Sequence, residues 1–191
     1  VNFPRSIGAL SGTKSIFQVE ENTMNIIRIC LACTATLSCA ANANLIVNGS
    51  FEDSNLNPGT QWIPMSSGDT SITGWTTIGS GVDYMGTILA ASDGTRSIDI
   101  NNLNAGGGIS QTFATMVGWV YTVEFDMSAN MYGGPTPKEM SVSADGQSEL
   151  FEFDYVAAGS TGANPMWERM SFMFIGDGSS ATLSFSGVST G

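Results

Sequence analysis

Several aromatic side chains of this sequence stand in segments rich in Gly, Pro, Asn and Ser, where loops are expected. An aromatic ring in a loop can stack on the C–H face of a sugar ring, while neighbouring amide, carboxylate and guanidinium groups hydrogen-bond to hydroxyls. The residues that we predict for such a carbohydrate-binding site are Trp62, Tyr84, Arg96, Trp119 and Tyr132, with Trp167 as a further aromatic candidate. Each ring could instead pack in a core, and we expect this of Trp75, which opens an apolar segment after a turn.

The charged candidates have competing interpretations. Arg96 stands near Asp93 and Asp99, so it can form a bidentate ion pair with a carboxylate or hydrogen-bond to sugar hydroxyls. Glu52 and Asp53 can contribute to a structural calcium site, which needs six to eight oxygen ligands, or they can be ordinary solvated carboxylates. The chain lacks the D-x-D-x-D-G spacing of a calcium loop, and no other cofactor is expected.

The composition argues against catalysis and against nucleic-acid binding. The 191 residues include no histidine, which removes the commonest general base and most zinc sites. Glu152 and Asp154 are spaced as neighbours on the exposed face of one strand, where alternating charges are normally solvated. Six basic residues against 17 acidic ones give a net charge of −11, whereas nucleic-acid binding requires clustered Lys and Arg. We therefore predict that the protein is not an enzyme and has no nucleic-acid partner.

The sequence near the amino terminus has the features of a secretion signal. After Met24, Arg28 supplies a positive charge and residues 29–37 form a short apolar run. Ala41 and Ala43 then form an A-x-A cleavage site. We expect cleavage after Ala43 and a mature protein that is secreted, in the extracellular space or at the cell surface.

These features divide the chain into three parts. Residues 24–43 are the predicted signal peptide, and residues 44–191 are the mature domain. Residues 1–23 are expected to be an upstream over-extension of the gene model, the alternative being an unusually long region before the apolar run. All three cysteines precede residue 44, so we expect a mature domain without a disulfide and without a membrane span.

The mature domain has the alternating pattern of half-buried strands. Apolar and polar side chains alternate along residues 121–127, as they do in a strand whose successive side chains point to opposite faces. The same alternation occurs over residues 97–100, 109–113, 151–155, 170–174 and 182–185. Turn signals such as Asp93-Gly94 and Asp145-Gly146 separate these segments. Because no long segment repeats apolar residues at helical spacing, we predict an all-β fold, a two-sheet sandwich or jelly roll.

Short motifs occur in a fixed order along this domain. They are Asn-Leu-Ile-Val-Asn-Gly-Ser-Phe-Glu at 44–52, Ile-Thr-Gly-Trp at 72–75, Val-Asp-Tyr at 82–84, Ala-Ser-Asp-Gly-Thr-Arg-Ser-Ile-Asp-Ile at 91–100, Gly-Gly-Ile-Ser-Gln-Thr-Phe at 107–113 and Tyr-Thr-Val-Glu-Phe-Asp at 121–126. The series resembles the bacterial choice-of-anchor C family, which is related to the plant cell-wall family called domain of unknown function 642. The resemblance implies a secreted, galactose-binding-domain-like jelly roll at a cell surface or wall, with residues 44–52 as its opening strand.

The sequence departs from this family in two places. Members often end in an anchoring signal with a membrane helix and a basic tail, and their last strand carries an Asp soon after a segment like residues 183–188. Neither feature occurs in the sequence, so we expect either a fragment of a longer protein or a jelly roll that lacks its last strand. Ile88 and Leu89 also stand where relatives tend to carry aromatic residues, which weakens a sugar-stacking role there.

The patterns and the resemblance together predict a non-catalytic carbohydrate-binding module whose partner is a polysaccharide or cell-wall glycan. The alternative is a structural cell-surface or matrix protein that makes protein–protein contacts and binds no sugar. Exposed loop aromatics that line one concave surface would favour carbohydrate binding, whereas a flat polar surface with every Trp buried would favour the structural role.

Overall fold

The computed structural model describes residues 7–10, 44–101, 106–132 and 136–188. The predicted signal peptide, with Ala41 and Ala43, lies outside the described residues. The described parts form strands and connecting loops and contain no helix. The strands are β1 (Ile7–Leu10), β2 (Trp62–Met65), β3 (Thr76–Gly79), β4 (Val82–Met85), β5 (Ser97–Asp99), β6 (Gly107–Ala114), β7 (Val120–Met127), β8 (Lys138–Ala144), β9 (Gln147–Phe153), β10 (Glu168–Ile175) and β11 (Ser180–Gly187).

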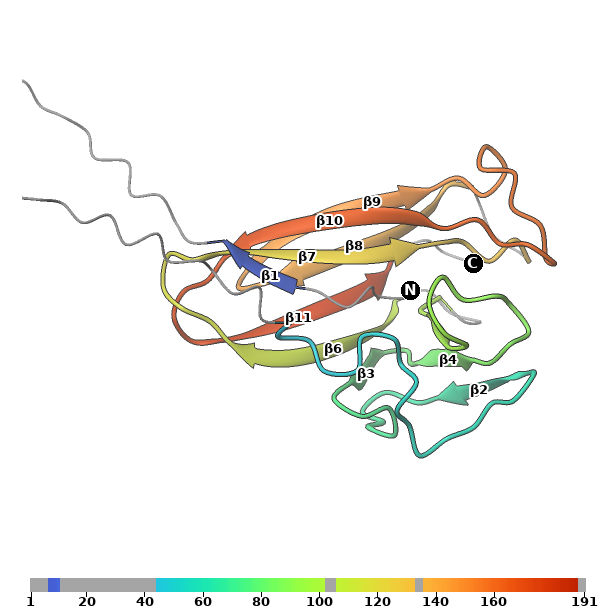
Figure 1. Cartoon of the computed structure of the whole chain (residues 1–191), viewed down its shortest axis with the longest axis horizontal. Helices are drawn as coiled ribbons and strands as arrows, with labels where there is room; N and C mark the ends of the chain where they lie inside the picture. Colours follow the sequence, from blue (N-terminus) through green and yellow to red (C-terminus); the bar gives the residue numbers. More distant parts are fainter. Residues whose placement is uncertain (1–6, 11–43, 102–105, 133–135, 189–191) are drawn as a thin grey trace, which may run out of the picture.

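Two antiparallel sheets form the body of the molecule, and a smaller sheet lies at one end (Figure 1). The strand orders are β1-β7-β10 in one large sheet, β3-β6-β11-β8-β9 in the other, and β2-β4-β5 in the small sheet. The chain crosses from β6 to β7, returns for β8 and β9, crosses again for β10 and returns for β11. Repeated crossing between two packed sheets is jelly-roll connectivity, so the predicted all-β jelly-roll sandwich is confirmed.

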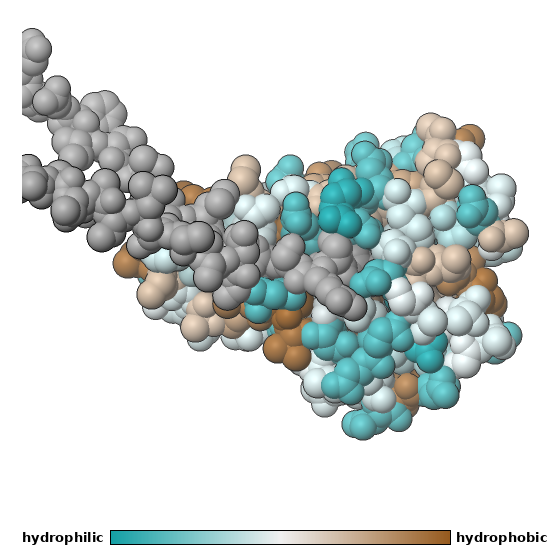
Figure 2. Space-filling view, viewed as in Figure 1, coloured by the Kyte–Doolittle hydropathy of each residue, from teal (hydrophilic) through white to brown (hydrophobic). Residues whose placement is uncertain are grey.

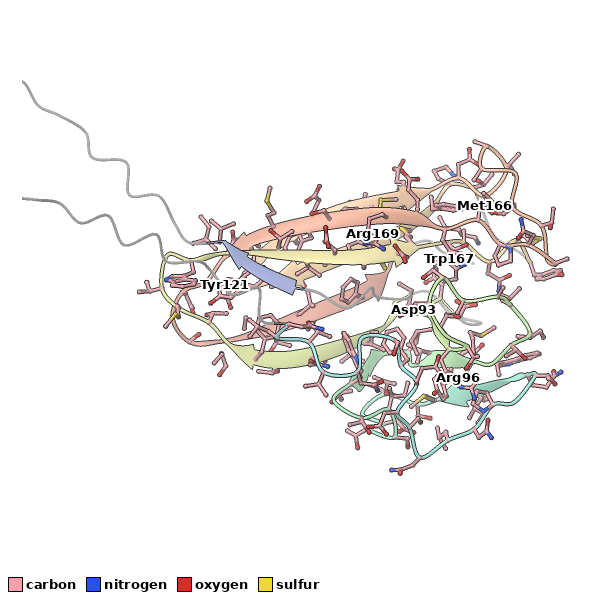
Figure 3. All side chains as sticks on the ribbon, in the orientation of Figure 1. Asp93, Arg96, Tyr121, Met166, Trp167 and Arg169 are labelled. Atoms are coloured by element: carbon pink, nitrogen blue, oxygen red, sulfur yellow. The ribbon has the colours of Figure 1, made fainter. Side chains whose placement is uncertain are left out.

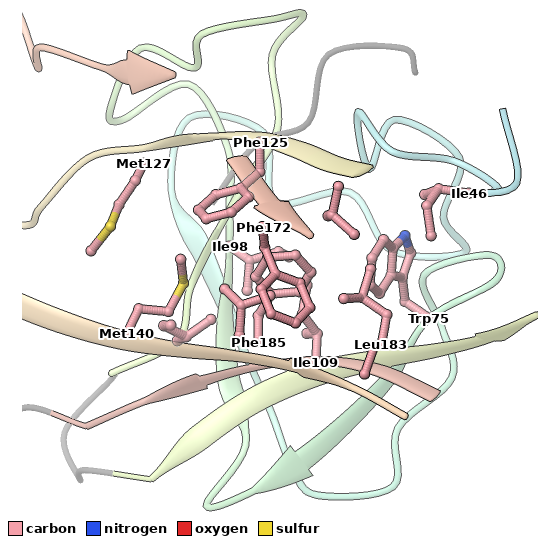
Figure 4. Close-up of a cluster of buried hydrophobic side chains, with 14 of the residues drawn as sticks. Ile46, Trp75, Ile98, Ile109, Phe125, Met127, Met140, Phe172, Leu183 and Phe185 are labelled. Carbon is pink, nitrogen blue, oxygen red and sulfur yellow. The ribbon is translucent and has the colours of Figure 1, made fainter. Parts of the chain in front are cut away.

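The core lies between the large sheets and is built by the alternation visible in the sequence. Along β7 the side chains of Tyr121, Val123 and Phe125 are at most 3% exposed, while Thr122 and Glu124 reach the other face. The Phe125 ring packs against the rings of Phe151 in β9 and Phe185 in β11, which belong to the opposite sheet. Figure 4 shows Phe125 and Phe185 in this cluster. Burial of these rings removes a large apolar area from water, which is the main stabilising contribution to such a core.

The β8–β9 turn follows the sequence prediction. Asp145 and Gly146 both have positive φ, 48° and 71°, which a two-residue turn of this hairpin requires. The turn sets the register in which Ala144 pairs with Gln147 and Met140 pairs with Phe151. Both apolar partners of the second pair then face the core, because paired residues of an antiparallel sheet share a face.

The expected opening strand at residues 44–52 is wrong. Asn48 and Phe51 have positive φ, 53° and 62°, which a continuous strand cannot contain. The backbone N–H and C=O of Val47 bond instead to the side-chain amide of Gln111, at 2.7 and 2.9 Å. This segment therefore caps the end of the core with the fully buried Phe51 ring rather than extending a sheet.

The remaining strand, β1, adds to an edge of the sandwich. Its residues Ile7–Leu10 pair antiparallel with Val120 to Val123 of β7, on the side of β7 opposite β10. They belong to residues 1–23, which precede the predicted signal peptide. Among the residues that the structure describes, no helix has the length and apolar character needed to cross a membrane.

Candidate ligand-binding groove

One face of the small sheet forms the floor of a groove. The cross-strand pairs on this face are Trp62 with Met85, Pro64 with Asp83, and Asp83 with Asp99. Paired residues share a face, so strands β2, β4 and β5 present these side chains together. Pro64 is compatible with its strand because β2 is an edge of the sheet and proline donates no ladder hydrogen bond. The opposite face packs into the core through the buried side chains of Met65, Val82, Tyr84 and Ile98.

The groove consists of two adjoining cavities that share Asp83, Leu89, Asn130 and Tyr132. The outer part has a volume of about 560 Å³, and its further lining residues are Trp62, Pro64, Ile88 and Gly162. The inner chamber has a volume of about 370 Å³ and extends to Met85, Met127, Met131, Lys138, Glu139, Met140 and Trp167. Both volumes fall within the range of sites that bind small ligands.

Polar side chains hold the loops that wall the groove. Asn130 accepts a hydrogen bond from the Tyr132 N–H at 2.9 Å, which fixes the turn after β7. Its Nδ2 donates to Asp99 Oδ2 at 3.0 Å and ties this turn to β5. On the other side, Trp167 Nε1 donates to the Ala90 carbonyl at 3.0 Å. The loop after β7 and the segment before β10 are thereby each tied to the region of residues 90–99, at the end of the sandwich where Figure 3 labels Trp167.

Two of the sequence-predicted residues meet in the outer part of the groove. The side chains of Trp62 and Tyr132 are 47% and 73% exposed, and both line the same cavity. The Tyr132 hydroxyl lies over Gly162, where a Cβ atom would come within 2.5 Å of the hydroxyl oxygen. The groove therefore presents two accessible aromatic rings from a strand and a loop that the sequence separates widely.

The structure corrects the interpretation of Tyr84. Its ring is fully buried and its hydroxyl donates a hydrogen bond to the Phe51 carbonyl at 2.8 Å. Burial raises the pKa of the Tyr84 hydroxyl, against smaller opposing effects of Ser54 and Arg96. Tyr84 points away from the groove because it is one residue out of phase with Asp83 and Met85, so it belongs to the core. Trp75 is also buried, as expected, and its Nε1 donates to the Asn48 carbonyl.

Trp119 and Arg96 lie outside the groove lining. Trp119 is partly buried against the core just before β7, at the end where Figure 3 labels Tyr121 and opposite Trp167. Arg96 directs its guanidinium to the Asn57 side chain and the Thr95 carbonyl, at 3.1 and 3.2 Å. Neither residue joins the two aromatic rings of the outer groove, and their assignment to the sugar site is not supported by this placement.

Of the two predicted calcium residues, Glu52 lies beside the Asp93-Gly94 turn. The two carboxylate oxygens of Glu52 accept hydrogen bonds from the N–H and hydroxyl of Thr95, at 2.6 and 2.8 Å. Among the described residues, no group of three or more Asp, Glu, Cys or His side chains is arranged to hold a metal ion. Backbone carbonyls also serve calcium, so a site at Glu52 and Asp53 remains a prediction.

The charged groups of the groove are mostly acidic. Asp83, Asp99 and Glu139 line it together with one cation, Lys138. Sequence reasoning did not predict these residues or the methionines of the inner chamber. One signal in the sequence could have identified Asp83 and Met85 as groove residues. They alternate with the buried Tyr84 along one strand, which places both on the face opposite the Tyr84 ring.

Comparisons with known proteins identify the family of this chain. No curated protein matches the chain. The solved structures that it resembles include the native family 35 carbohydrate binding module from Clostridium thermocellum, with 15% identity, a TM-score of 0.45, and 67% of this chain and 88% of that chain covered. A family GH115 4-O-methyl-α-glucuronidase follows with 12% identity, a TM-score of 0.35, and coverages of 69% and 15%. A family model described as protein of unknown function (DUF642) matches residues 44–190, so the chain belongs to the DUF642 family.

Proposed function

We propose that this chain is a secreted, non-catalytic module that binds a polysaccharide or cell-wall glycan in the groove. The observation that carries the proposal is the convergence of Trp62 and Tyr132, both exposed, on one concave surface. Large aromatic rings at the surface of a soluble protein leave apolar area in contact with water, and a ligand that covers them removes this cost. On the face shown in Figure 2, hydrophobic residues reach the surface in small, separate groups.

The surroundings of the two rings suit a sugar. A pyranose ring has apolar C–H faces, which stack on aromatic rings, and hydroxyls at its rim, which need hydrogen-bond partners. Asp83 lies where the two parts of the groove meet and presents a carboxylate that can accept hydrogen bonds from such hydroxyls. The combination of stacking rings with a few polar groups is the usual composition of a small-molecule site.

Asp154, one of the two carboxylates considered as a glycosidase pair, has the pKa shift opposite to that of a general acid. A glycosidase needs one carboxyl group with a raised pKa as general acid. The pKa of Asp154 is lowered instead, chiefly by the hydrogen bond from the Ala157 N–H and also by the Thr136 hydroxyl. Asp154 thus caps the turn after β9 and is already engaged with the chain.

Three further parts of the proposal rest on the sequence. The signal peptide over residues 24–43 supports export to the extracellular space or the cell surface. The ordered motifs support a place among the bacterial choice-of-anchor C proteins. A structural calcium at Glu52 and Asp53 would hold the segment before the small sheet, and its removal would then lower the stability of the fold.

The experiment is a binding assay with a panel of immobilised neutral, acidic and amine-bearing polysaccharides, with and without calcium. We expect the purified chain to bind at least one polysaccharide of the panel. Trp62→Ala and Tyr132→Ala should each weaken this binding by roughly tenfold or more, because each removes a stacking ring. The matched control is Val117→Ala, which trims a 77% exposed apolar side chain outside the groove lining.

The outcomes separate the two functions considered for this protein. Failure of the folded chain to bind any polysaccharide would contradict the proposal and favour the structural, protein-binding role. Binding that Trp62→Ala and Tyr132→Ala leave unchanged would contradict the placement of the site in the groove.

A further inference from the structure

Four methionine side chains converge on the inner chamber of the groove. Met85 ends β4, Met127 ends β7, Met131 lies in the following loop and Met140 lies in β8. Met85, Met127 and Met140 are at most 7% exposed, so the chamber has an apolar wall although its rim is polar. The methionine side chain is unbranched and polarisable, which lets such a wall adapt to the shape of a small apolar group.

A bare sugar hydroxyl is poorly suited to this wall. A hydroxyl that enters an apolar space loses its hydrogen bonds to water and gains none from thioethers comparable in strength. A methyl group has no hydrogen bonds to lose in the same transfer, and removal of its apolar surface from water stabilises the bound state. The chamber therefore favours a glycan that carries an apolar substituent.

Ser128 adds a polar requirement at the same place. Its Oγ is buried and lines the inner chamber, and among the described residues it has no hydrogen-bond partner. A buried hydroxyl without a partner is costly, and a ligand with an acceptor atom would satisfy it. The complementary substituent thus combines a methyl group with a hydrogen-bond acceptor close to it.

The charges of the chamber restrict the substituent further. Asp83, Asp99 and Glu139 outnumber Lys138 in the lining. A carboxylate or sulfate on the sugar would enter a region of net negative charge and be repelled. An uncharged substituent does not meet this repulsion.

We infer that the inner chamber receives an acetyl group of an acetylated glycan, with its methyl among the methionines and its carbonyl accepting a hydrogen bond from the Ser128 hydroxyl. The inference deepens the proposed function and depends on it, since the outer aromatic rings carry the sugar to which the acetyl group is attached. It assigns recognition of the sugar ring to the outer part of the groove and recognition of its decoration to the inner chamber.

The experiment uses matched pairs of neutral polymers, acetylated glucomannan and acetylated xylan with the same polymers after alkaline removal of the ester groups. De-esterification changes no charge, so the pair isolates the acetyl group. We expect the wild-type chain to bind at least one acetylated polymer roughly three- to tenfold more tightly than its de-esterified form, the range that burial of one methyl group with its hydrogen bond provides.

Two variants test the chamber itself. Ser128→Ala removes the donor, and Met131→Gln places an amide in the apolar wall at a partly exposed position. Each should reduce the preference for the acetylated polymer to less than twofold while binding of the de-esterified polymer stays within twofold of wild type. The control is Met173→Gln, the same substitution at a methionine that is 63% exposed on β10 outside the groove lining, which should keep the full preference. Thermal unfolding of each variant establishes that it is folded. If Met131→Gln does not fold, the result with Ser128→Ala alone decides the test.

The outcomes distinguish this inference from the proposed function. Equal binding of the acetylated and de-esterified polymers, or a preference that Ser128→Ala leaves intact, would overturn the acetyl site while the glycan-binding function stands. Binding to other polysaccharides of the panel but to neither acetylated polymer would also overturn it. Absence of binding to every polysaccharide would overturn the proposed function first.

Discussion

The core of the sandwich and the groove at its end both contain aromatic rings and methionines, but they hold them in different ways. In the core, the Phe125 ring lies 5.0 Å from the Phe151 ring and 5.2 Å from the Phe185 ring, measured between centroids. In the groove, the rings of Trp62 and Tyr132 remain exposed.

The means of positioning also differ between the two regions. Core rings are placed by strand alternation and by close packing, so a loss of volume there leaves a cavity. The Tyr132 loop is placed by a few polar contacts, such as the hydrogen bond from Asn130 to Asp99. The difference teaches that stability and binding reside in separate side chains, which substitutions can test one region at a time.

The largest effect is expected from Phe125→Ala. Removal of this fully buried ring should lower the free energy of unfolding by about 3–5 kcal/mol, because the transfer energy is lost and a cavity remains. Trp62→Ala should lower it by less than about 1 kcal/mol, since its ring is nearly half exposed. Urea unfolding of both variants measures the two values. Similar losses would show that the groove is part of the stabilising core.

Strand alternation explains why the sandwich could be predicted from the sequence. Residues 121–127, 170–174 and 182–185 alternate because one face is buried, and the corresponding strands β7, β10 and β11 occur with the expected faces inward. The strand predicted at residues 44–52 was wrong because the apolar residues of this segment cap the end of the core instead of pairing with a neighbouring strand. Val47 pairs with the Gln111 side chain, a long-range contact that no local pattern records.

The groove was predictable only in part, for a related reason. Trp62 and Tyr132 stood in polar loop sequence, which indicated exposure but not that they would meet. Tyr84 was misassigned because its strand has only four residues, so the alternation of Asp83 and Met85 around it was a weak signal for the core position of its ring. The methionine wall combines residues from four segments, and their proximity depends on sheet pairing.

The second prediction concerns Tyr84, which marks the boundary between the two regions. Tyr84→Phe should lower the free energy of unfolding by about 1–3 kcal/mol, because the buried Phe51 carbonyl loses its hydrogen-bond donor. The folded protein has a raised Tyr84 pKa, so the stability due to the neutral hydroxyl is present below pH 10.0, its ordinary pKa, and is lost as the pH rises through the folded value. Wild-type stability should therefore fall at alkaline pH more steeply than that of the variant. Parallel curves from pH 8 upward would contradict the burial of this hydroxyl.

The third prediction concerns the link between the Tyr132 loop and the small sheet. Asn130→Ala removes the hydrogen bonds to Asp99 and to the Tyr132 N–H, and it should weaken glycan binding several-fold while lowering the free energy of unfolding by only about 1 kcal/mol. Gln147→Ala is the matched control, because its side-chain amide similarly joins β9 to Ile175 away from the groove. Equal effects of the two variants on binding would show that Asn130 has no positioning role.

The smallest effect is expected from a surface carboxylate at the end opposite the groove. Asp177 accepts hydrogen bonds from the Ser179 hydroxyl and N–H at 2.6 and 2.8 Å, and these bonds lower its pKa below the ordinary value of 3.8. A lowered folded pKa means that the stability due to this carboxylate is present above pH 3.8 and is lost as the pH falls through the folded value. Asp177→Asn should therefore be slightly less stable than wild type at pH 6, and the difference should shrink as the pH falls below 3.8. Urea unfolding at pH 6 and at a pH below 3.8 measures the difference in stability between the two proteins. A difference that grows on acidification would contradict the sign of this pKa shift.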